Sequence, residues 1–325
     1  MTQDIALVQQ AGERARENIG RVVIGMEEAI ELLLVALFCE GHVLLEDVPG
    51  IGKTTLAKAL ARSLGCSFSR VQFTADLLPS DITGVSVYNQ RTQTFEFRPG
   101  PVFAQVVLAD EINRAGPRTQ SALLEAMQER QVSADGLTRP LERPFIVLAT
   151  QNPIELEGTF PLPEAQLDRF LLRLALGYPG REDEREILRR FRTEDPMESL
   201  EPVLQGAEVL RLAAICREVF VHPVMEEYIL SVIEATRKSD DLALGASPRA
   251  TLALYHCAQA LAALRGRDYV IPDDVQALVE PALAHRLIPS ARQRLYGQAT
   301  RGILADLLAT VPVPVEERWD GSGEG

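Results

Sequence analysis

Apolar runs and amphipathic stretches alternate along the first half of the chain. Short apolar runs cover residues 42–46, 68–73, 105–110 and 145–152, and another follows at 170–176. Strands that are buried on both faces of a sheet show such continuous runs, whereas half-exposed strands alternate between apolar and polar positions. Helical patterns separate these runs, and right-handed crossovers are the default connection between parallel strands. The pattern therefore predicts an α/β fold, with a parallel sheet covered by helices on both faces.

Helical periodicity dominates the remainder of the sequence. Residues 1–40 carry apolar side chains at helical spacing, and amphipathic segments such as REDEREILRRF follow one another through residues 181–310. Because the strand pattern stops near 178–181, we predict an N-terminal helix and α/β core over 1–178 and an all-helical lid domain over 181–310. The tail, 311–325, contains alternating prolines and ends in DGSGEG, so we expect it to be disordered.

Two insertions interrupt the α/β pattern. Between residues 84 and 100, VSVYN and TFEFR flank a polar turn, which predicts a β-hairpin. Residues 131–144 predict a second, shorter hairpin that turns at Asp135–Gly136, a pair typical of tight turns. Because exposed loops often carry function, the hairpin at 84–100 is a reasonable place for a partner to bind.

Composition and charge narrow the class of protein. The chain has 325 residues, 46% of them apolar and 24% charged, which are ordinary globular proportions. Acidic residues outnumber Lys and Arg by 46 to 33, for a net charge of −13, so we expect no nucleic-acid partner. The longest apolar run, 32–39, is far shorter than the ~20 residues that span a bilayer, and the N-terminus lacks signal-peptide features. We therefore expect a cytoplasmic protein without membrane insertion.

Cysteine and histidine add no candidate chemistry. The chain has four of each, and neither a Cys-x-x-Cys pair nor a His-Glu-x-x-His pattern occurs. Disulfide scaffolds and zinc sites need clustered ligands. The sequence thus gives little support to a zinc enzyme or to catalysis by a thiol or imidazole.

The strongest functional signal is a glycine-rich turn between an apolar run and a helix. It ends in Gly52-Lys53-Thr54 and fits the P-loop pattern G-x-x-x-x-G-K-[ST], except that Asp47 stands where glycine is usual. Glycines let successive N–H groups converge on a phosphate, and the helix that follows adds its positive end. We expect Lys53 to reach the β- and γ-phosphates and Thr54 to bind Mg²⁺. The candidate ATP-binding residues are Asp47, Val48, Pro49, Gly50, Ile51, Gly52, Lys53, Thr54 and Thr55.

Polar residues follow two later apolar runs. Asp110 and Glu111 end the run at 105–110, and Asn152 ends the run at 145–152. Catalytic groups collect at the carboxyl ends of parallel strands. We expect Asp110 to hold Mg²⁺ through water, Glu111 to polarise an attacking water and Asn152 to bridge that water and the γ-phosphate. Taken singly, acids before a helix and an Asn-Pro turn also have purely structural explanations.

At this point the sequence resembles the AAA+ ATPases, and within them the MoxR-type group, from about Val22 to Thr310. The most specific segments are EDVPGIGKT, VLADEINRAGPRTQSALLEAMQE, ATQNPIELEGTFPLPEAQLDRF and GASPRA. The two predicted hairpins fall where this group carries insertions. Asp47 also occurs in members of this type, so the departure from the P-loop pattern casts little doubt on the resemblance.

The resemblance implies roles that the spacing alone does not. It implies that Asn152 is the sensor 1 residue, that Arg169 is an arginine finger in a neighbouring subunit's site, and that Arg249 is sensor 2. Arg114 and Arg118 are rival interfacial arginines, and an exposed arginine such as Arg169 also has the plain alternative of a solvated side chain. The resemblance does not say whether Arg249 acts in its own site or in a neighbour's.

It also implies a fold and an activity. The fold is the AAA+ P-loop sheet followed by a helical lid, and the segment at 22–30 packs against adenine, with ordinary core as the alternative. Such proteins form rings, here a homo-hexamer, and hydrolyse ATP with Mg²⁺ to ADP and phosphate. The implied work is to remodel, activate or mature a client protein, including clients with a von Willebrand factor A domain that acquire a metal. Three alternatives stay open: an ATPase subunit of a metal-chelatase complex, a P-loop small-molecule kinase and a nucleotide-gated scaffold.

Overall fold

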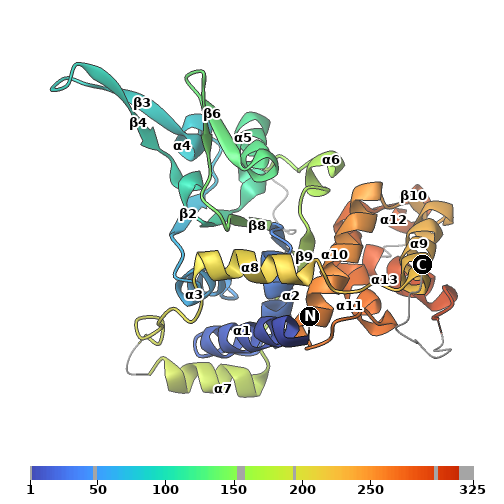
Figure 1. The fold of residues 1–325 in the computed structure, drawn as a ribbon. Coiled ribbons are helices and arrows are strands. Elements are labelled where there is room, and N and C mark those ends of the chain that lie inside the picture. Colours follow the sequence, from blue (N-terminus) through green and yellow to red (C-terminus); the bar gives the residue numbers. More distant parts are fainter. Residues whose placement is uncertain (1, 47–49, 152–157, 193–194, 296–298, 315–325) are drawn as a thin grey trace.

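The structure is a computed structural model that describes residues 2–46, 50–151, 158–192, 195–295 and 299–314. Its centre is a parallel five-stranded sheet with the order β2-β5-β8-β1-β9 (Figure 1). These strands are β1 (Val43–Glu46), β2 (Phe68–Gln72), β5 (Val106–Asp110), β8 (Ile146–Gln151) and β9 (Leu172–Leu174). The predicted parallel sheet is confirmed, and each predicted apolar run contains one of its strands.

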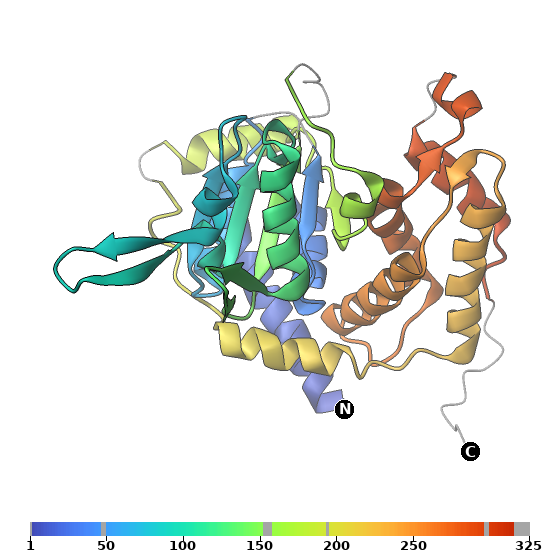
Figure 2. The same cartoon turned by 90° about the horizontal axis from the view of Figure 1, so that it is seen from above.

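Side chains of the central strands alternate between two hydrophobic cores. Leu45, Leu108 and Leu148 point into one core, and their neighbours Val107 and Val147 point into the other. Helices cover both faces, as Figure 2 shows in the view from above. The first face is covered by α1 (Thr2–Gly20), α2 (Glu27–Phe38) and α3 (Lys53–Ser63), and the second by α4 (Pro79–Thr83) and α5 (Pro117–Glu129). Burial on both faces explains why β1, β5 and β8 are apolar at nearly every position.

Both predicted hairpins are present. β3 (Gly84–Asn89) pairs with β4 (Thr94–Pro99), and this hairpin projects from the body (Figure 2). β6 (Gln131–Ala134) pairs with β7 (Leu137–Pro140) through a turn in which Asp135 and Gly136 have φ values of 53° and 75°. Positive φ at both central residues is the backbone of a tight type I′ hairpin turn.

The C-terminal part is mainly helical and shares its core with the N-terminal helices. Its helices are α7 (Arg181–Arg190), α8 (Gly206–Cys216), α9 (Pro223–Lys238), α10 (Pro248–Leu264), α11 (Pro272–Leu283), α12 (Ala291–Leu295) and α13 (Thr300–Thr310). α8 and α10 both pack against α1 and α2, so one continuous core joins the two parts of the chain. The domain boundary near 178–181 stays a prediction, and most of the predicted disordered tail lies outside the described residues.

Two details differ from the sequence pattern. Residues 1–40 form two helices with a break at 21–26, and the lid contains a short antiparallel strand pair that helical periodicity did not predict. That pair joins β10 (Leu242–Leu244) and β11 (Ile288–Pro289), which are too short to leave a pattern in the sequence. A four-residue helix, α6 (Glu164–Leu167), and three single 3₁₀ turns complete the described part. Among the described helices, none has both the length and the apolarity to cross a bilayer.

Candidate nucleotide site

The glycine-rich turn leads directly into the first turn of α3. Gly50 and Gly52 have φ values of 88° and 96°, a region that residues with a side chain rarely adopt. Gly52 is the N-cap of α3, Lys53 is its first residue, and the first turn carries no acidic side chain. The positive end of the helix dipole is therefore not neutralised from within, which favours a bound anion. Asp47, Val48 and Pro49 lie outside the described residues.

A cavity of about 370 Å³ opens in front of this helix end. It brings together seven of the predicted site residues, from the glycine-rich turn and from the end of β5. Its lining is Gly50, Gly52, Lys53, Thr54, Thr55, Arg70, Gln72, Asp110, Glu111 and Thr150. Asn152 lies outside the described residues, so its predicted role is not placed. Hydroxyl and carboxylate oxygens on opposite walls are the ligands that Mg²⁺ takes together with phosphate oxygens and water, so this lining fits a Mg²⁺–nucleotide complex.

Asp110 is held by residues of the two neighbouring strands. The hydroxyl of Thr150 on β8 donates to its Oδ1 at 2.7 Å, and the guanidinium of Arg70 on β2 pairs with its Oδ2 at 2.6 Å. A charge-assisted bond on one oxygen and a hydroxyl on the other fix the plane of the carboxylate. The side chain of Asp110 is 16% exposed, on the side that faces the cavity.

Glu111 adopts an unusual backbone conformation. Its φ and ψ are 56° and 52°, left-handed values that cost a residue other than glycine free energy and that cluster at functional sites. The Thr150 hydroxyl accepts a hydrogen bond from the Glu111 N–H at 2.8 Å and so supports this conformation. Gln72 Nε2 and the Arg114 guanidinium donate to Oε2 of Glu111 at 2.9 and 3.0 Å. Thus Gln72 and Arg114 hold the candidate water-activating carboxylate from two sides.

Arg70, Gln72 and Thr150 were not among the residues predicted from the sequence. Arg70 and Gln72 flank the buried Val71 on β2, so they are the polar positions of a strand that is half exposed near its end. The alternation of polar and apolar positions indicates that Arg70 and Gln72 are exposed. It does not indicate which strand β2 pairs with, and therefore not that they lie beside Asp110 and Glu111. Thr150 is buried at 1% exposure and is hidden inside an otherwise apolar run.

A second cavity, of about 400 Å³, borders the first and shares Gly50, Gly52 and Thr55 with it. Most of its other lining is apolar, namely Val22, Val23, Ile24, Met26, Ile51, Tyr178, Pro179, Ile187 and Phe191, with Glu184 at one side. Four of these residues belong to the segment at 22–30 that is expected beside adenine. α7 closes the cavity, and Arg190 on that helix donates to the carbonyls of Gly20 and Arg21 at 2.8 and 3.0 Å. An apolar slot next to a phosphate cradle suits a nucleobase.

Arg169 and Arg249 lie at the opposite end of the sheet, on the side that we call the arginine edge. β9 runs parallel to β1, with Val43 opposite Leu172, and Arg169 precedes β9. The glycine-rich turn follows β1, so the two features occupy opposite ends of the same pair of strands. Arg169 and Arg249 together line a cavity of about 170 Å³ with His42 and residues from the end of α5. Neither arginine lines the phosphate cavity of its own chain.

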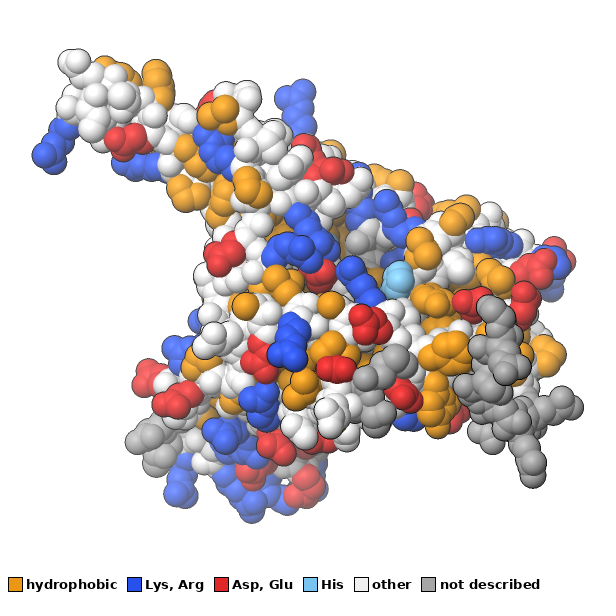
Figure 3. Space-filling model, in the orientation of Figure 1, with side chains coloured by type: hydrophobic (Ala, Val, Ile, Leu, Met, Phe, Trp, Pro, Cys, Tyr) orange, Lys and Arg blue, Asp and Glu red, His pale blue; other side chains and the backbone are white. Residues whose placement is uncertain are grey.

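Further arginines gather on this edge around one buried carboxylate. Glu40, whose side chain is 5% exposed, accepts from Arg130 at 3.3 Å, from Arg143 at 2.9 Å and from Arg217 at 3.2 Å. Figure 3 shows Lys and Arg side chains gathered over the middle of one face, between the hairpins and α8. A cavity of about 390 Å³ joins Glu40 and Arg130 with Arg169 and Arg249. In a chain of net charge −13, this edge is locally basic.

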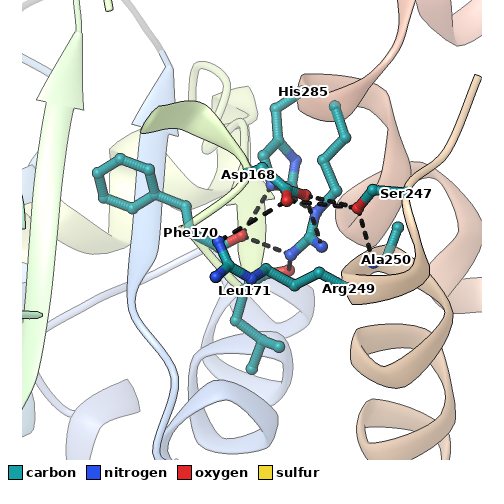
Figure 4. A network of polar contacts seen from close by, with 8 residues as sticks. Asp168, Phe170, Leu171, Ser247, Arg249, Ala250 and His285 are labelled. Atoms are coloured by element: carbon teal, nitrogen blue, oxygen red, sulfur yellow. Dashed lines mark hydrogen bonds and ion pairs between the residues drawn. The ribbon is translucent and has the colours of Figure 1, made fainter. Parts of the chain in front are cut away.

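Asp168 connects this edge of the sheet to the lid (Figure 4). Its carboxylate accepts from the Ser247 hydroxyl at 3.2 Å and from Arg286 at 3.1 Å, and it forms an ion pair of 3.7 Å with Arg249. The Ser247 hydroxyl is also the N-cap of α10, because it accepts from the N–H of Ala250. These three lid residues all contact Asp168, which immediately precedes Arg169 in the chain.

Comparison with known proteins agrees with this geometry. Residues 42–172 match the model of the ATPase family associated with various cellular activities (AAA), and residues 234–304 match the AAA lid domain. The chain is 49% identical to the uncharacterized protein YeaC of Bacillus subtilis, over 93% of this chain and 95% of that protein. It is 48% identical to chaperone MoxR1 of Mycobacterium tuberculosis, over 85% of this chain and 75% of that protein.

Two further relatives extend the comparison. Protein MoxR of Paracoccus denitrificans is 36% identical over 92% of this chain and 95% of its own length. A crystal structure from Cytophaga hutchinsonii, provisionally described as an ATPase, superposes with a TM-score of 0.90 and 38% identity over 96% of this chain and 98% of that one. The sheet, the helical lid and these similarities over most of each chain show that the protein belongs to the MoxR-type AAA+ ATPases.

Proposed function

We propose that this chain hydrolyses ATP at the interfaces of a ring of identical subunits, a homo-hexamer, and uses the cycle to remodel client proteins. One observation carries the proposal: the phosphate cavity lies where the parallel strands end, and the arginine pair lies at the opposite end of the sheet, where β9 begins. A site that needs both must take them from two chains. The membership of the family supports nucleotide hydrolysis, and the geometry supports its location between subunits.

In this proposal the residues of the phosphate cavity have separate tasks. The turn at Gly50–Thr55 binds the phosphates, and Thr54 and Asp110 hold Mg²⁺, which would neutralise charge on the phosphate oxygens when bound. Glu111 accepts a proton from the attacking water. Gln72 and Thr150 keep that carboxylate and its backbone in place, at 2.9 and 2.8 Å respectively.

Arg169 and Arg249 serve the neighbouring subunit's site. A guanidinium that meets the γ-phosphate stabilises the charge that develops as the bond to the leaving group breaks. The arginine edge as a whole is positively charged, which favours its approach to the negatively charged nucleotide of a neighbouring subunit. We assign Arg249 to the neighbour's site rather than its own, and this assignment is supported by the cavity that it lines together with Arg169, because it does not line the cavity that contains Lys53.

The client is proposed from relatives and not from a site in this chain. The name chaperone MoxR1 supports remodelling or maturation of another protein. Clients with a von Willebrand factor A domain, and insertion of a metal into them, follow only from the family resemblance. A metal-chelatase subunit would share this fold and site, and a partner that inserts a metal into a tetrapyrrole would distinguish it.

The test is the ATPase rate per subunit as a function of protein concentration. We expect the rate of the wild type to rise with concentration as subunits assemble, and the Arg169→Ala variant to stay at least ~10³-fold lower at every concentration. Arg301→Ala is the matched control, because that arginine of α13 has a side chain that is 76% exposed and forms an ion pair with Glu280. Its rate should follow the wild-type curve.

Two outcomes would contradict the proposal. A rate per subunit that is independent of concentration and of Arg169 would mean that each chain carries a complete site, and a small-molecule kinase would become the better explanation. No turnover at any concentration, with tight ATP binding, would instead indicate a nucleotide-gated scaffold.

A further inference from the structure

We propose that Asp168 is a positioning residue that fixes Arg169 and holds Arg249 ready for the neighbouring subunit's nucleotide. The inference rests on the proposed function and adds a residue to it. Asp168 was not among the candidates from the sequence, and it does not line the phosphate cavity of its own chain. Its role comes from what it binds in the lid and from its place next to Arg169.

The backbone of Arg169 is anchored on both sides. On one side, Asp168 accepts from Ser247 and Arg286 of the lid. On the other side, the carbonyl oxygen of Phe170 accepts from Arg286 at 2.7 Å and lies 2.9 Å from Nε2 of His285. The Phe170 side chain is 0% exposed, so it is fixed in the core as well. An arginine between two immobilised neighbours loses less conformational freedom when it binds a phosphate.

The two arginines that meet the Asp168 carboxylate differ in burial. The Arg286 side chain is 2% exposed, whereas the Arg249 side chain is 50% exposed. A buried guanidinium that loses its counter-charge is costly, so the bond between Arg286 and Asp168 has to persist. The ion pair with Arg249 is longer, at 3.7 Å, and half exposed, so it is weak and easily exchanged for a phosphate.

Asp168 therefore has a fixed contact and an exchangeable one. Through Arg286 and Ser247 it locks the lid to the sheet edge, and this lock sets where α10 begins. Because Arg249 is in the first turn of α10, the lock also sets the distance between Arg249 and Arg169. Asp168 is the resting partner of Arg249 until a neighbour's γ-phosphate replaces it.

Kinetics of Asp168→Asn test this role. The amide keeps the size and can still accept from Ser247, but it removes the charge. We expect kcat to fall by ~10²-fold, the cost of a small misplacement of catalytic groups, with little change in KM for ATP. Asp168→Glu keeps the charge and should recover part of kcat. The control is Glu234→Gln, which removes a carboxylate from an exposed ion pair within α9 and should leave both constants unchanged.

Mixing two variants of reduced activity separates this role from a general loss of folding. The Asp168→Asn variant has an intact phosphate cavity and an impaired arginine edge. The Glu111→Gln variant has an impaired phosphate cavity and an intact arginine edge. When the two proteins are mixed before ATP is added, some interfaces combine the intact half of each, so activity above the sum of the separate proteins is expected. A protein that had merely lost its fold would not be rescued in this way.

The results separate failure of this inference from failure of the proposed function. If the wild-type rate depends on concentration and on Arg169, but Asp168→Asn retains wild-type kcat, then Asp168 is not a positioning residue. If Asp168→Asn is impaired and mixing with Glu111→Gln restores nothing, the positioning role is likewise overturned, because the defect is then not confined to the arginine edge. A wild-type rate that is independent of concentration would overturn the interface site itself.

Discussion

At the scale of single residues, His42 shows how the fold constrains a titratable group. Its Nδ1 accepts from the N–H of Val147 at 3.0 Å, and its Nε2 lies 3.0 Å from the carbonyl oxygen of Met127. An imidazole that accepts at one nitrogen and donates at the other has to be neutral. Burial lowers its pKa from 6.5 to about 4, because the charged form would lose its contact with water.

We expect this histidine to make the protein less stable in mild acid. The unfolded chain takes up the proton near pH 6.5, whereas the folded chain does not do so until about pH 4. The contribution of His42 is therefore fully present above pH 6.5 and is lost as the pH falls to about 4, by about 3 kcal/mol in all. Denaturant unfolding of the wild type and His42→Gln at several pH values measures it.

The comparison between variants isolates this effect from that of the carboxylates. His42→Gln should have a shallower dependence of unfolding free energy on pH than the wild type. Arg301→Gln, which changes an exposed side chain of α13, should keep the wild-type slope. Equal slopes for the wild type and His42→Gln would show that the buried ring takes up its proton as easily as a free one.

The same scale shows what a sequence reveals about a site. The residues of the glycine-rich turn and the Asp110–Glu111 pair could be predicted because their chemistry depends on neighbours in the chain. Arg70, Thr150 and Asp168 could not, because each acts on a residue that is distant in sequence. Arg70 meets Asp110 only because β2 and β5 pair in one particular register. Strand order and register follow from the packing of the whole sheet.

At the scale of elements, continuous apolar runs predicted the central strands well because burial on both faces leaves no other pattern. Turn chemistry did the same for the hairpins, where Asp135–Gly136 supplies two residues that tolerate positive φ. The pattern failed where an element is very short. β11 covers only Ile288–Pro289, and its pairing with β10 depends on how the lid helices pack around it.

α7 offers an element-scale test of the base pocket. Ile187 lines the apolar cavity, and the adjacent Leu188 is 74% exposed and does not. We expect Ile187→Asp to raise KM for ATP by about 10-fold or more, because it replaces apolar contact with the base by a charge. Leu188→Asp puts the same charge one position along the helix and should leave KM unchanged. Steady-state ATPase kinetics of the two variants provide the comparison.

In that experiment kcat is informative as well. The base lies away from the bond that breaks, so a loss of base contact should weaken binding in the ground state and the transition state alike. A fall in kcat without a rise in KM would place Ile187 outside the base pocket. A rise in KM for Leu188→Asp of the same size would attribute the effect to charge on α7 in general.

At the scale of the whole molecule, one core runs from the helices behind the sheet into the lid. Leu37 of α2 and Leu261 of α10 both belong to it and are 1% and 0% exposed, respectively. Parts that share a core unfold together, whereas parts joined by a small polar contact unfold separately. The lid should therefore not melt on its own.

Calorimetry checks this expectation. We expect a single unfolding transition, and Leu37→Ala and Leu261→Ala should each shift it to lower temperature through a loss of about 2–5 kcal/mol. Leu295→Ala, at a side chain that is 88% exposed, is the control and should not shift it. Two resolved transitions, of which only one moves in each variant, would show that body and lid are thermodynamically independent.

In the ring proposed above, the position of the phosphate cavity and the arginine edge at opposite ends of β1 and β9 would give each subunit one side that supplies arginines and one side that receives them. Copies that associate through these sides line up head to tail, and this kind of contact continues until the row closes on itself. In an open row of any length, the two end subunits each lack one neighbour. The phosphate cavity of one end subunit therefore has no arginine pair beside it, and the arginine pair of the other end subunit contacts no phosphate cavity. The subunit that closes the ring forms two complete interfaces in one step, whereas each earlier subunit formed one.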